Sequence, residues 1–245
     1  MTSPLVAVRE LQVRLGHDEF RVELGMSRNS GEIVFLLRDN GNVVRGNALA
    51  YALRENGFGT AICHLLTDAE RERAGQSHKA PLSSDLLARR LMAVVDAVGD
   101  EADPAVTSAG IVASGMAGAA AMRVAALRPL AFDAIVCRHA KFNSFRALPY
   151  VRAATLFLAI AGDLACTHPM TRAFQELQCV KRFELVSGGS TTFDEERSFR
   201  MATELTTTWM RKHVGHIASA VNPPSVQPTN VSSAITMIPP EINVV

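Results

Sequence analysis

Short apolar runs alternate with stretches of helical spacing along most of the chain. The apolar runs predict strands over Phe20–Leu24, Glu32–Leu37, Gly59–Leu65, Ser108–Ala113, Asp133–Cys137, Thr155–Ala161 and Lys181–Val186. The helical spacing predicts helices over Gly46–Glu55, Ser84–Val98, Met116–Leu127, Pro169–Leu177 and Glu195–His213. Runs such as IVFLL and TLFLAIA show no polar alternation, which is typical of strands buried on both faces of a parallel sheet. The pattern therefore predicts repeated βαβ units and a doubly wound, mostly parallel α/β fold.

The periodic pattern stops near residue 215, so we expect one domain over residues 1–215 and an extended tail over residues 216–245. The tail is rich in Pro, Ser, Thr, Asn and Val and carries one acid, Glu241. Its end, Ile235–Val245 (ITMIPPEINVV), is apolar. This end is either a strap on its own domain or a peptide that docks on a partner, which we expect to be another protein or a second copy of this chain.

The composition excludes several classes of partner. The 245 residues are 48% hydrophobic and 20% charged, and the net charge is +1, so we expect no binding to nucleic acid or to membranes. The N-terminus lacks the pattern of a signal peptide, and five prolines interrupt the uncharged run over residues 217–240, so we expect a cytoplasmic protein. The four cysteines have no CxxC spacing and are predicted to be mostly buried, reduced thiols.

The segment Ser108–Met122 (SAGIVASGMAGAAAM) is predicted to form a buried strand, a tight turn of small residues and an Ala-rich helix. This is the shape of a nucleophile elbow, whose central residue usually has a positive φ and whose residues two before and two after are small. With Gly115 at the tip, both flanking positions are Ala. With Ser114 at the tip they are Val112 and Met116, which are too large. The predicted tip is therefore Gly115, which has no side chain to attack a substrate.

From Phe20 to about Val214 the chain resembles α/β-hydrolases of the dienelactone-hydrolase-like group. The resemblance lies in the order and spacing of ENGFGTAICHLLT, PLSSDLLARRLMAVVDAV and GIVASGMAGAAAMRVAALRP. It implies an uncapped α/β-hydrolase fold. It also implies a nucleophile at Gly115, an acid at Asp163 after the strand that ends at Ala161, and a base at Thr191 in the loop SGGSTTF.

Two of the three catalytic positions implied by the resemblance therefore lack the required chemistry. Thr191 has no group that titrates near neutral pH, so it cannot shuttle a proton. The loop Arg38-Asp39-Asn40-Gly41 stands where relatives usually carry a His-Gly loop that supplies an oxyanion-hole amide.

Other polar residues are predicted near the carboxyl ends of the strands, where doubly wound sheets bind ligands. The candidates for lining a ligand pocket are Arg38, Asp39, Asn40, His64, Met116 and His139. A rebuilt triad of Ser114, His139 and Asp163 is one alternative, although His139 follows a different strand from the usual base. A metal site of His64, His139 and Asp163 is another, but no local ligand spacing supports it, so no metal is expected.

The glycine-rich segments do not indicate a cofactor. The spacing GxGxxG of a dinucleotide-binding loop is absent, so no cofactor is expected. SGGSTT could bind an anion through its backbone amides, or it is a plain loop. Cys63 and Cys137 lie within apolar strands, where burial makes a thiol inert.

Three functions are consistent with these patterns. The first is a catalytically degenerate hydrolase homologue, a pseudoenzyme that acts as a structural, accessory or binding subunit of an oligomer or assembly. The second is an active serine esterase or lactonase on a small ester, with a rearranged site around Ser114. The third is a small-molecule sensor that retains the pocket without turnover.

Overall fold

The computed structural model describes residues 8–26, 31–38, 43–76, 83–101, 107–188, 193 and 195–215. In this part of the chain, eight strands form one sheet in the order β1-β2-β4-β3-β5-β6-β7-β8. The strands from β3 to β8 run parallel, and β2 pairs antiparallel with both β1 and β4. The mostly parallel α/β fold predicted from the apolar runs is confirmed.

The strands agree with the predicted runs to within a few residues. They are β1 Val8–Leu15, β2 Asp18–Gly25, β3 Glu32–Arg38, β4 Gly59–His64, β5 Ser108–Ser114, β6 Ala134–Ala140, β7 Ala154–Ile160 and β8 Lys181–Val186. The helices are α1 Val43–Glu55, α2 Asp68–Gln76, α3 Ser84–Glu101, α4 Gly115–Leu127, α5 Leu164–Glu176 and α6 Glu196–His213, with a short 3-10 helix, η1, at Leu148–Tyr150.

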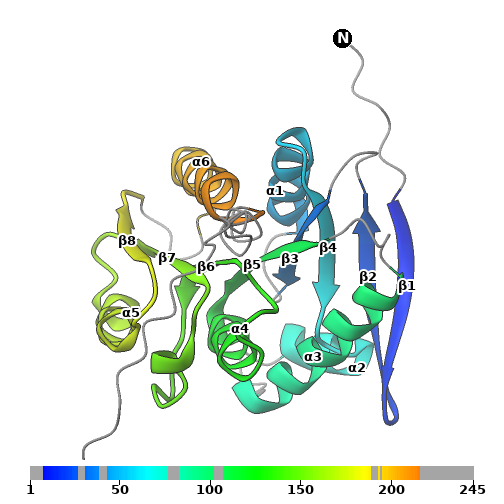
Figure 1. The fold of residues 1–245 in the computed structure, drawn as a ribbon. Helices are drawn as coiled ribbons and strands as arrows, with labels where there is room; N and C mark the ends of the chain where they lie inside the picture. Colours follow the sequence, from blue (N-terminus) through cyan, green and yellow to red (C-terminus); the bar gives the residue numbers. More distant parts are fainter. Residues whose placement is uncertain are drawn as a thin grey trace, which may run out of the picture.

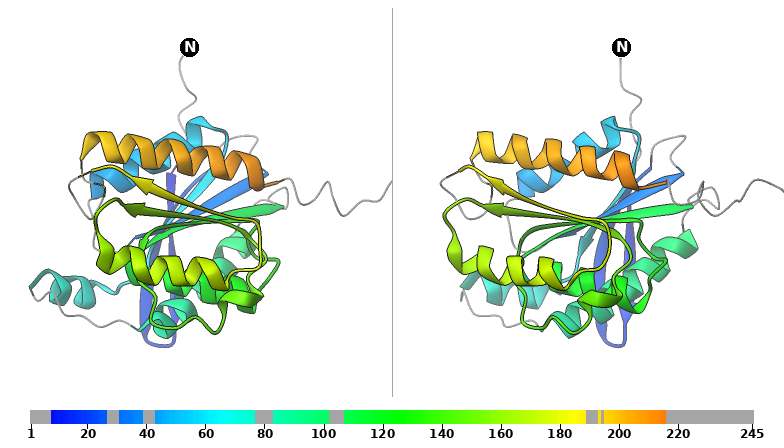
Figure 2. Two further views of the ribbon diagram at one scale, coloured as in Figure 1. Left: turned by 90° about the vertical axis from the view of Figure 1, so that its left-hand side faces the viewer. Right: turned by 60° about the vertical axis from the view of Figure 1, so that its left-hand side comes forward.

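Helices cover both faces of the sheet (Figures 1 and 2). Helices α1 and α6 lie on one face, and α3, α4 and α5 lie on the other. We call these the α1/α6 face and the α4/α5 face. The connection from β6 to β7 contains η1 as its only helix, and it runs over the α4/α5 face. None of the described helices is long and apolar enough to cross a membrane.

Three elements were not predicted: the short helix η1, the edge strand β1 and the polar helix α2. β1 is an edge strand in which Val13 is the only fully buried residue, so it has no continuous apolar run. Its pairing with β2, rather than its own hydrophobicity, makes it a strand. α2 (DAERERAGQ) is strongly polar and so shows no apolar stripe. Its first turn is capped, because Thr67 and Glu70 exchange hydrogen bonds between side chain and backbone N–H.

Several predicted boundaries differ from the structure by three residues or more, and two of them bear on the candidate site. β6 does not end at Cys137 but runs to Ala140, so His139 lies within the strand. α5 begins at Leu164, five residues before the predicted start at Pro169. The reason is that Asp163 caps α5, its Oδ1 accepting a hydrogen bond from the backbone N–H of Cys166 at 3.2 Å. Pro169 therefore lies inside the helix.

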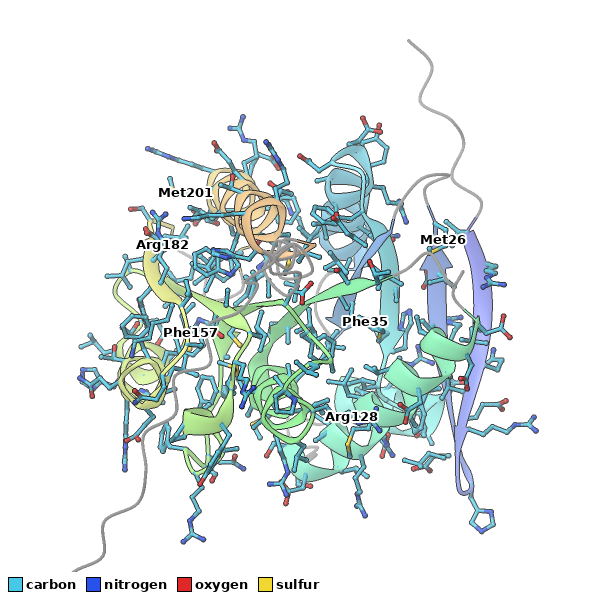
Figure 3. All side chains as sticks on the ribbon, viewed as in Figure 1. Met26, Phe35, Arg128, Phe157, Arg182 and Met201 are labelled. Atoms are coloured by element: carbon cyan, nitrogen blue, oxygen red, sulfur yellow. The ribbon has the colours of Figure 1, made fainter. Side chains whose placement is uncertain are left out.

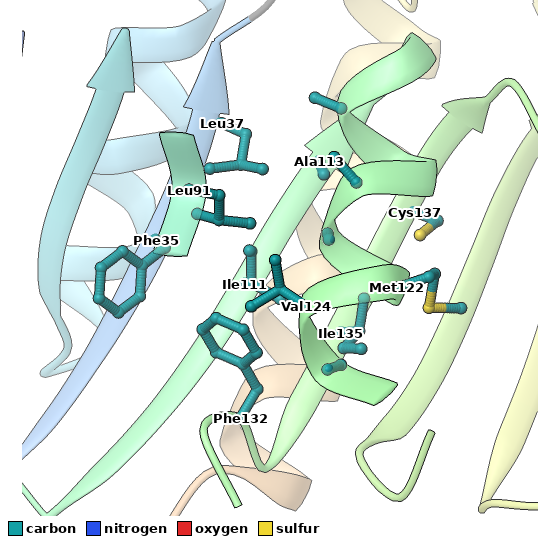
Figure 4. Packing of buried hydrophobic residues seen from close by; sticks show 14 of the residues in the cluster. Phe35, Leu37, Leu91, Ile111, Ala113, Met122, Val124, Phe132, Ile135 and Cys137 are labelled. Carbon is teal, nitrogen blue, oxygen red and sulfur yellow. The ribbon is translucent and has the colours of Figure 1, made fainter. Parts of the chain in front are cut away.

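The core has one apolar layer on each face of the sheet. On the α4/α5 face, Ile111 and Ile135 of the sheet pack against Val124 of α4, and Phe35 meets Phe132 edge to face (Figure 4). Phe157 lies deeper towards α5 in the same layer (Figure 3). Strand residues alternate between the layers, since Ala113 belongs to this one and Val112 to the layer under α1 and α6.

One buried charge joins three elements outside the apolar layers. The side chain of Arg90 in α3 is 2% exposed. Its guanidinium donates to Glu70 at 2.7 and 3.0 Å, to Asp18 at 2.8 Å and to the carbonyl of Leu65 at 3.0 Å. It also lies 4.7 Å from the ring centre of Phe20. Arg90 therefore ties α2 and the start of β2 to α3.

Candidate functional site

The turn between β5 and α4 has the geometry expected of an elbow. β5 ends at Ser114, which is extended (φ −129°, ψ 166°), and Gly115 follows with φ 53°. The residues two before and two after Gly115, Ala113 and Ala117, are 2% and 3% exposed. A larger side chain at either position would displace the strand or the helix, so small residues here are a packing requirement.

Backbone contacts hold the elbow against the end of β6. Gly115 forms a bridge with Ala140, and the carbonyl of Gly115 accepts a hydrogen bond from the N–H of Lys141 at 2.8 Å. One turn further along α4, a Cβ at Gly118 would lie 2.5 Å from Cβ of Ala140. The missing side chain of Gly118 therefore lets α4 run against β6.

Ser114 is adjacent to the elbow tip but faces the other side of the sheet. Its register partner is Arg138 in β6, and the preceding pair on the same face is Val112 with Val136. These valines belong to the α1/α6 layer. Because side chains alternate along an extended strand, Ser114 projects on the α1/α6 face.

His139 and Asp163 meet at the carboxyl ends of β6 and β7. Nε2 of His139 lies 3.2 Å from Oδ2 of Asp163, and the two side chains are 16% and 18% exposed. His139 has φ 48°, a backbone region that non-glycine residues rarely adopt. Nδ1 of His139 is buried. Asp163 follows Gly162, whose φ of 92° allows the turn into α5.

Several arginine and phenylalanine side chains stack at the same end of the sheet, on the α1/α6 face. The guanidinium carbon of Arg45 lies 4.6 Å from the ring centre of Phe199, and that of Arg138 lies 5.9 Å from the same ring and 5.0 Å from Phe193. Arg45 also pairs with Glu196 at 2.6 Å. Arg45, Phe193 and Phe199 were not predicted as site residues. The one signal available was that each flanks a loop at the carboxyl ends of the strands.

Of the remaining predicted pocket residues, the structure describes the side chains of His64 and Met116. His64, at the end of β4, is buried and lies 2.8 Å from Glu23 of β2. Met116 is half-buried in the first turn of α4. Asp39, Asn40, Thr191 and the tail end Ile235–Val245 lie outside the described residues, as does the side chain of Arg38.

The strand order separates the three groups of the metal alternative. His64 on β4 and His139 on β6 have β3 and β5 between them, which is roughly 14 Å at the usual strand spacing. His64 pairs with Glu23, whereas His139 pairs with Asp163. Among the described residues, no group of three or more His, Cys, Asp and Glu side chains could hold a metal ion.

The thiols near the sheet are poor nucleophiles. Burial raises the pKa of Cys63 and Cys137 far above neutral, so both remain protonated. Burial, with a contribution from the charge of Asp163, raises the pKa of Cys166 to about 11. The Cys166 thiol lies 3.6 Å from the carbonyl oxygen of Ala140 and 3.6 Å from the sulfur of Met170, inside the core.

No protein-family model matches the sequence, and no curated protein sequence matches it. Solved structures do match. A dienelactone hydrolase from Anabaena variabilis aligns with a TM-score of 0.75 and 24% identity, over 85% of this chain and 99% of that one. A dienelactone hydrolase-like promiscuous phosphotriesterase from metagenomic libraries aligns with a TM-score of 0.69 and 12% identity, over 86% and 99% of the two chains.

An esterase, Est1E from Butyrivibrio proteoclasticus, also matches, with a TM-score of 0.66 and 12% identity over 83% of this chain and 98% of that one. The three alignments cover 98–99% of the matched chains, so the likeness extends over the whole fold. The chain therefore has the α/β-hydrolase fold, and its structural neighbours include dienelactone hydrolases and proteins like them.

Proposed function

We propose that this chain is a catalytically degenerate α/β-hydrolase homologue, which acts by binding rather than by turnover. The observation that carries the proposal is Gly115, which has φ 53° at the turn from β5 into α4. A nucleophile elbow presents its side chain from this residue. Glycine presents none, so the position from which such enzymes attack an ester carries no nucleophile here.

The neighbouring hydroxyl does not replace the missing group. Ser114 is in register with Arg138 and projects on the α1/α6 face. Asp163 caps α5, a helix of the opposite α4/α5 face, and His139 contacts it. Covalent catalysis needs the nucleophile and the base within hydrogen-bond reach of each other. This arrangement therefore favours a binding role.

Both carboxylate oxygens of Asp163 already have partners. Oδ1 accepts from the N–H of Cys166 at the start of α5, and Oδ2 lies beside Nε2 of His139. A capping carboxylate that also holds a histidine has a sufficient structural role at this turn. Asp163 therefore needs no catalytic explanation.

One contact favours the second candidate, an esterase or lactonase on a small ester. The pair His139–Asp163 is the base-and-orienting-acid half of a triad, at 3.2 Å. In such a site Ser114 would attack, and His139 would take its proton through Nδ1 because Nε2 faces Asp163. That nitrogen is buried, which counts against proton exchange with a substrate.

The two functions differ in whether a serine becomes covalently labelled. We expect the full chain to resist a fluorophosphonate probe and to leave short-chain aryl esters unhydrolysed above the buffer rate. Ser114→Ala is the test variant, and Ser108→Ala at the opposite end of β5 is its matched control. Saturable labelling that Ser114→Ala abolishes and Ser108→Ala retains would establish the enzyme and overturn the degenerate assignment.

A gain-of-function variant tests the position of the tip. Gly115→Ser combined with Thr191→His supplies a nucleophile and a base at the positions that the resemblance implies. Fluorophosphonate labelling at position 115 in this double variant, and not in Gly115→Ala with Thr191→His, would support Gly115 as the vacated nucleophile position.

A binding role requires a partner. The prediction from the sequence is another protein or a second copy, engaged through the surface and the tail Ile235–Val245. Light scattering and pull-down, with the full chain compared to a chain that ends at Gly215, test that tail. Unchanged mass and unchanged co-purifying proteins would remove the tail from consideration. A small-molecule sensor would instead show saturable ligand binding without turnover.

A further inference from the structure

β1 forms one edge of the sheet and is paired on one side only (Figure 1). In the described part of the chain, no strand pairs with β1 on the side away from β2. The outer N–H and C=O groups of an edge strand can pair with a further strand. Which strand fits here depends on the residues that face outward.

The turn between β1 and β2 fixes which residues these are. Leu15 pairs with Asp18 across the two-residue turn of Gly16 and His17. The pair that closes such a turn exchanges both backbone hydrogen bonds, and hydrogen-bonded pairs then alternate along the ladder. The odd-numbered residues of β1 therefore bond to β2. The outward backbone groups belong to Val8, Glu10, Gln12 and Arg14, all of which are exposed.

A second copy of β1 can pair with these groups about a twofold axis. If the axis passes through Gln12, Glu10 of each copy lies opposite the second copy's Arg14, so two pairs of opposite charge form. A shift of the axis to Leu11 would place Glu10 opposite Gln12 and leave both arginines opposite Val8. The backbone permits both registers, and charge complementarity selects the first.

Apolar contacts on the other face of β1 favour the same register. Val13 is buried under α3, and Leu11 packs against the same layer. With the axis at Gln12, Leu11 of each copy lies opposite the second copy's Val13, so apolar side chains meet on the face that α3 covers. We propose that two copies of this chain associate through antiparallel pairing of their β1 edges, with Gln12 at the twofold axis, so that the two sheets become continuous.

The opposite edge of the sheet lacks this complementarity. In β8, the carbonyls of Val180 and Val186 accept from β7, so the residues that face outward are Lys181, Phe183 and Leu185. Twofold pairing about Phe183 would place each Lys181 opposite a leucine. Lysine at an edge strand opposes pairing. The complementary edge is therefore β1 alone among the two edges that the structure describes.

The side chains of the proposed pairs are free to rearrange on contact. Glu10 now accepts from Gln12 at 2.7 Å and lies 3.9 Å from Arg21 of β2, and Arg14 lies 3.3 Å from Glu19. Arg14 and Glu19 are 80% and 50% exposed, so these contacts can be exchanged at little cost. The dimer would add about six backbone hydrogen bonds between copies. The proposed dimer uses no residue of the candidate site, so a test of the dimer is independent of a test of the proposed function.

Complementation between two charge variants tests the register. In Glu10→Arg every cross-edge pair becomes Arg–Arg, and in Arg14→Glu every pair becomes Glu–Glu. We expect the full-length wild type to sediment with twice the chain mass of 26.4 kDa. Each variant alone should show a dimer dissociation constant raised by about tenfold or more. An equimolar mixture should regain the wild-type mass, because both pairs are again of opposite charge.

A backbone variant tests the pairing without charge. The N–H of Gln12 faces outward and the two copies of Gln12 pair on the axis, so Gln12→Pro removes two hydrogen bonds between copies and none between β1 and β2. The variant should be monomeric with an unchanged far-ultraviolet circular dichroism spectrum. A monomeric wild type at 100 μM, or charge variants that dimerise as tightly as the wild type, would overturn the proposal. So would a mixture that stays monomeric, or a dimer lost only on truncation at Gly215.

Discussion

Gly118 shows how tightly α4 is held against β6. A Cβ at this position would lie 2.5 Å from Cβ of Ala140, whereas ordinary carbon contacts are about 3.5–4.0 Å. Ala140 is fully buried on a strand and cannot rotate away. For Gly118→Ala, the helix must therefore shift by about 1 Å, which costs roughly 3 kcal/mol at the upper end for overpacking. The gain in helix propensity offsets about 1 kcal/mol of this.

The expected net loss for Gly118→Ala is about 2 kcal/mol in the free energy of unfolding. In a domain of this size, that lowers the melting temperature by roughly 4–8 °C. Gly99→Ala is the matched control, because Gly99 is also helical but nothing lies within 4 Å of its added Cβ. That change should raise the stability by about 0.5 kcal/mol. Urea denaturation followed by circular dichroism measures both.

A double-mutant cycle isolates the contact. Ala140→Gly removes the atom that the new Cβ would meet, and the next atoms, Cα of Ala140 and the sulfur of Cys137, lie at 3.4 and 3.8 Å. Adding Ala140→Gly to Gly118→Ala should therefore cost less than Ala140→Gly alone. A Gly118→Ala variant as stable as wild type, or additive effects in the double variant, would refute the close approach of α4 to β6.

Three further predictions concern other parts of the fold. Gly115→Ala should lower the free energy of unfolding by about 1–2 kcal/mol, because alanine at φ 53° is strained, and thermal unfolding measures this. An unchanged free energy of unfolding would refute the positive-φ turn. Burial raises the pKa of Glu70, but hydrogen bonds from Arg90 and Thr67 and the charge of Arg90 outweigh it and hold the pKa below its usual 4.5. The stabilisation that Glu70 provides is therefore complete above pH 4.5 and is lost as the pH falls through the lowered pKa. Glu70→Gln should be less stable than wild type at pH 7 by about 1–3 kcal/mol, and its free energy of unfolding should fall less on acidification. Identical pH profiles of the two proteins in urea titrations would contradict this. Iodoacetamide at pH 8 should label Cys179 of the native protein first, because Cys63, Cys137 and Cys166 are buried, and mass spectrometry of the labelled peptides checks the order.

The sequence was sufficient for the parts of the fold that depend on local requirements. A strand such as β7 is buried on both faces, so its residues must be apolar throughout, and that run is visible in one dimension. The turn at Gly115 could also be located. A tight strand-to-helix turn needs a residue that tolerates positive φ and small neighbours on both sides, and only one register satisfies both conditions.

The sequence was not sufficient where a partner supplies the stability. β1 has one fully buried residue and becomes a strand through its ladder with β2. The start of α5 was misplaced because the cap at Asp163 outweighs the signal of Pro169. Nothing in the sequence of α3 distinguishes Arg90 from the other arginines, and it is buried because carboxylates from two other elements surround it.

The contacts at the candidate site belong to this second class. His139 and Asp163 are distant in the sequence, and they meet because β6 and β7 are neighbours in the sheet. His64 and His139 have similar local surroundings, yet β3 and β5 separate them. The chain itself determined the buried strands, most of the helices between them and where the tight turn lies, because burial and backbone preference act on each residue locally. Only the tertiary structure decided which side chains meet, because the order of strands in the sheet differs from their order in the chain.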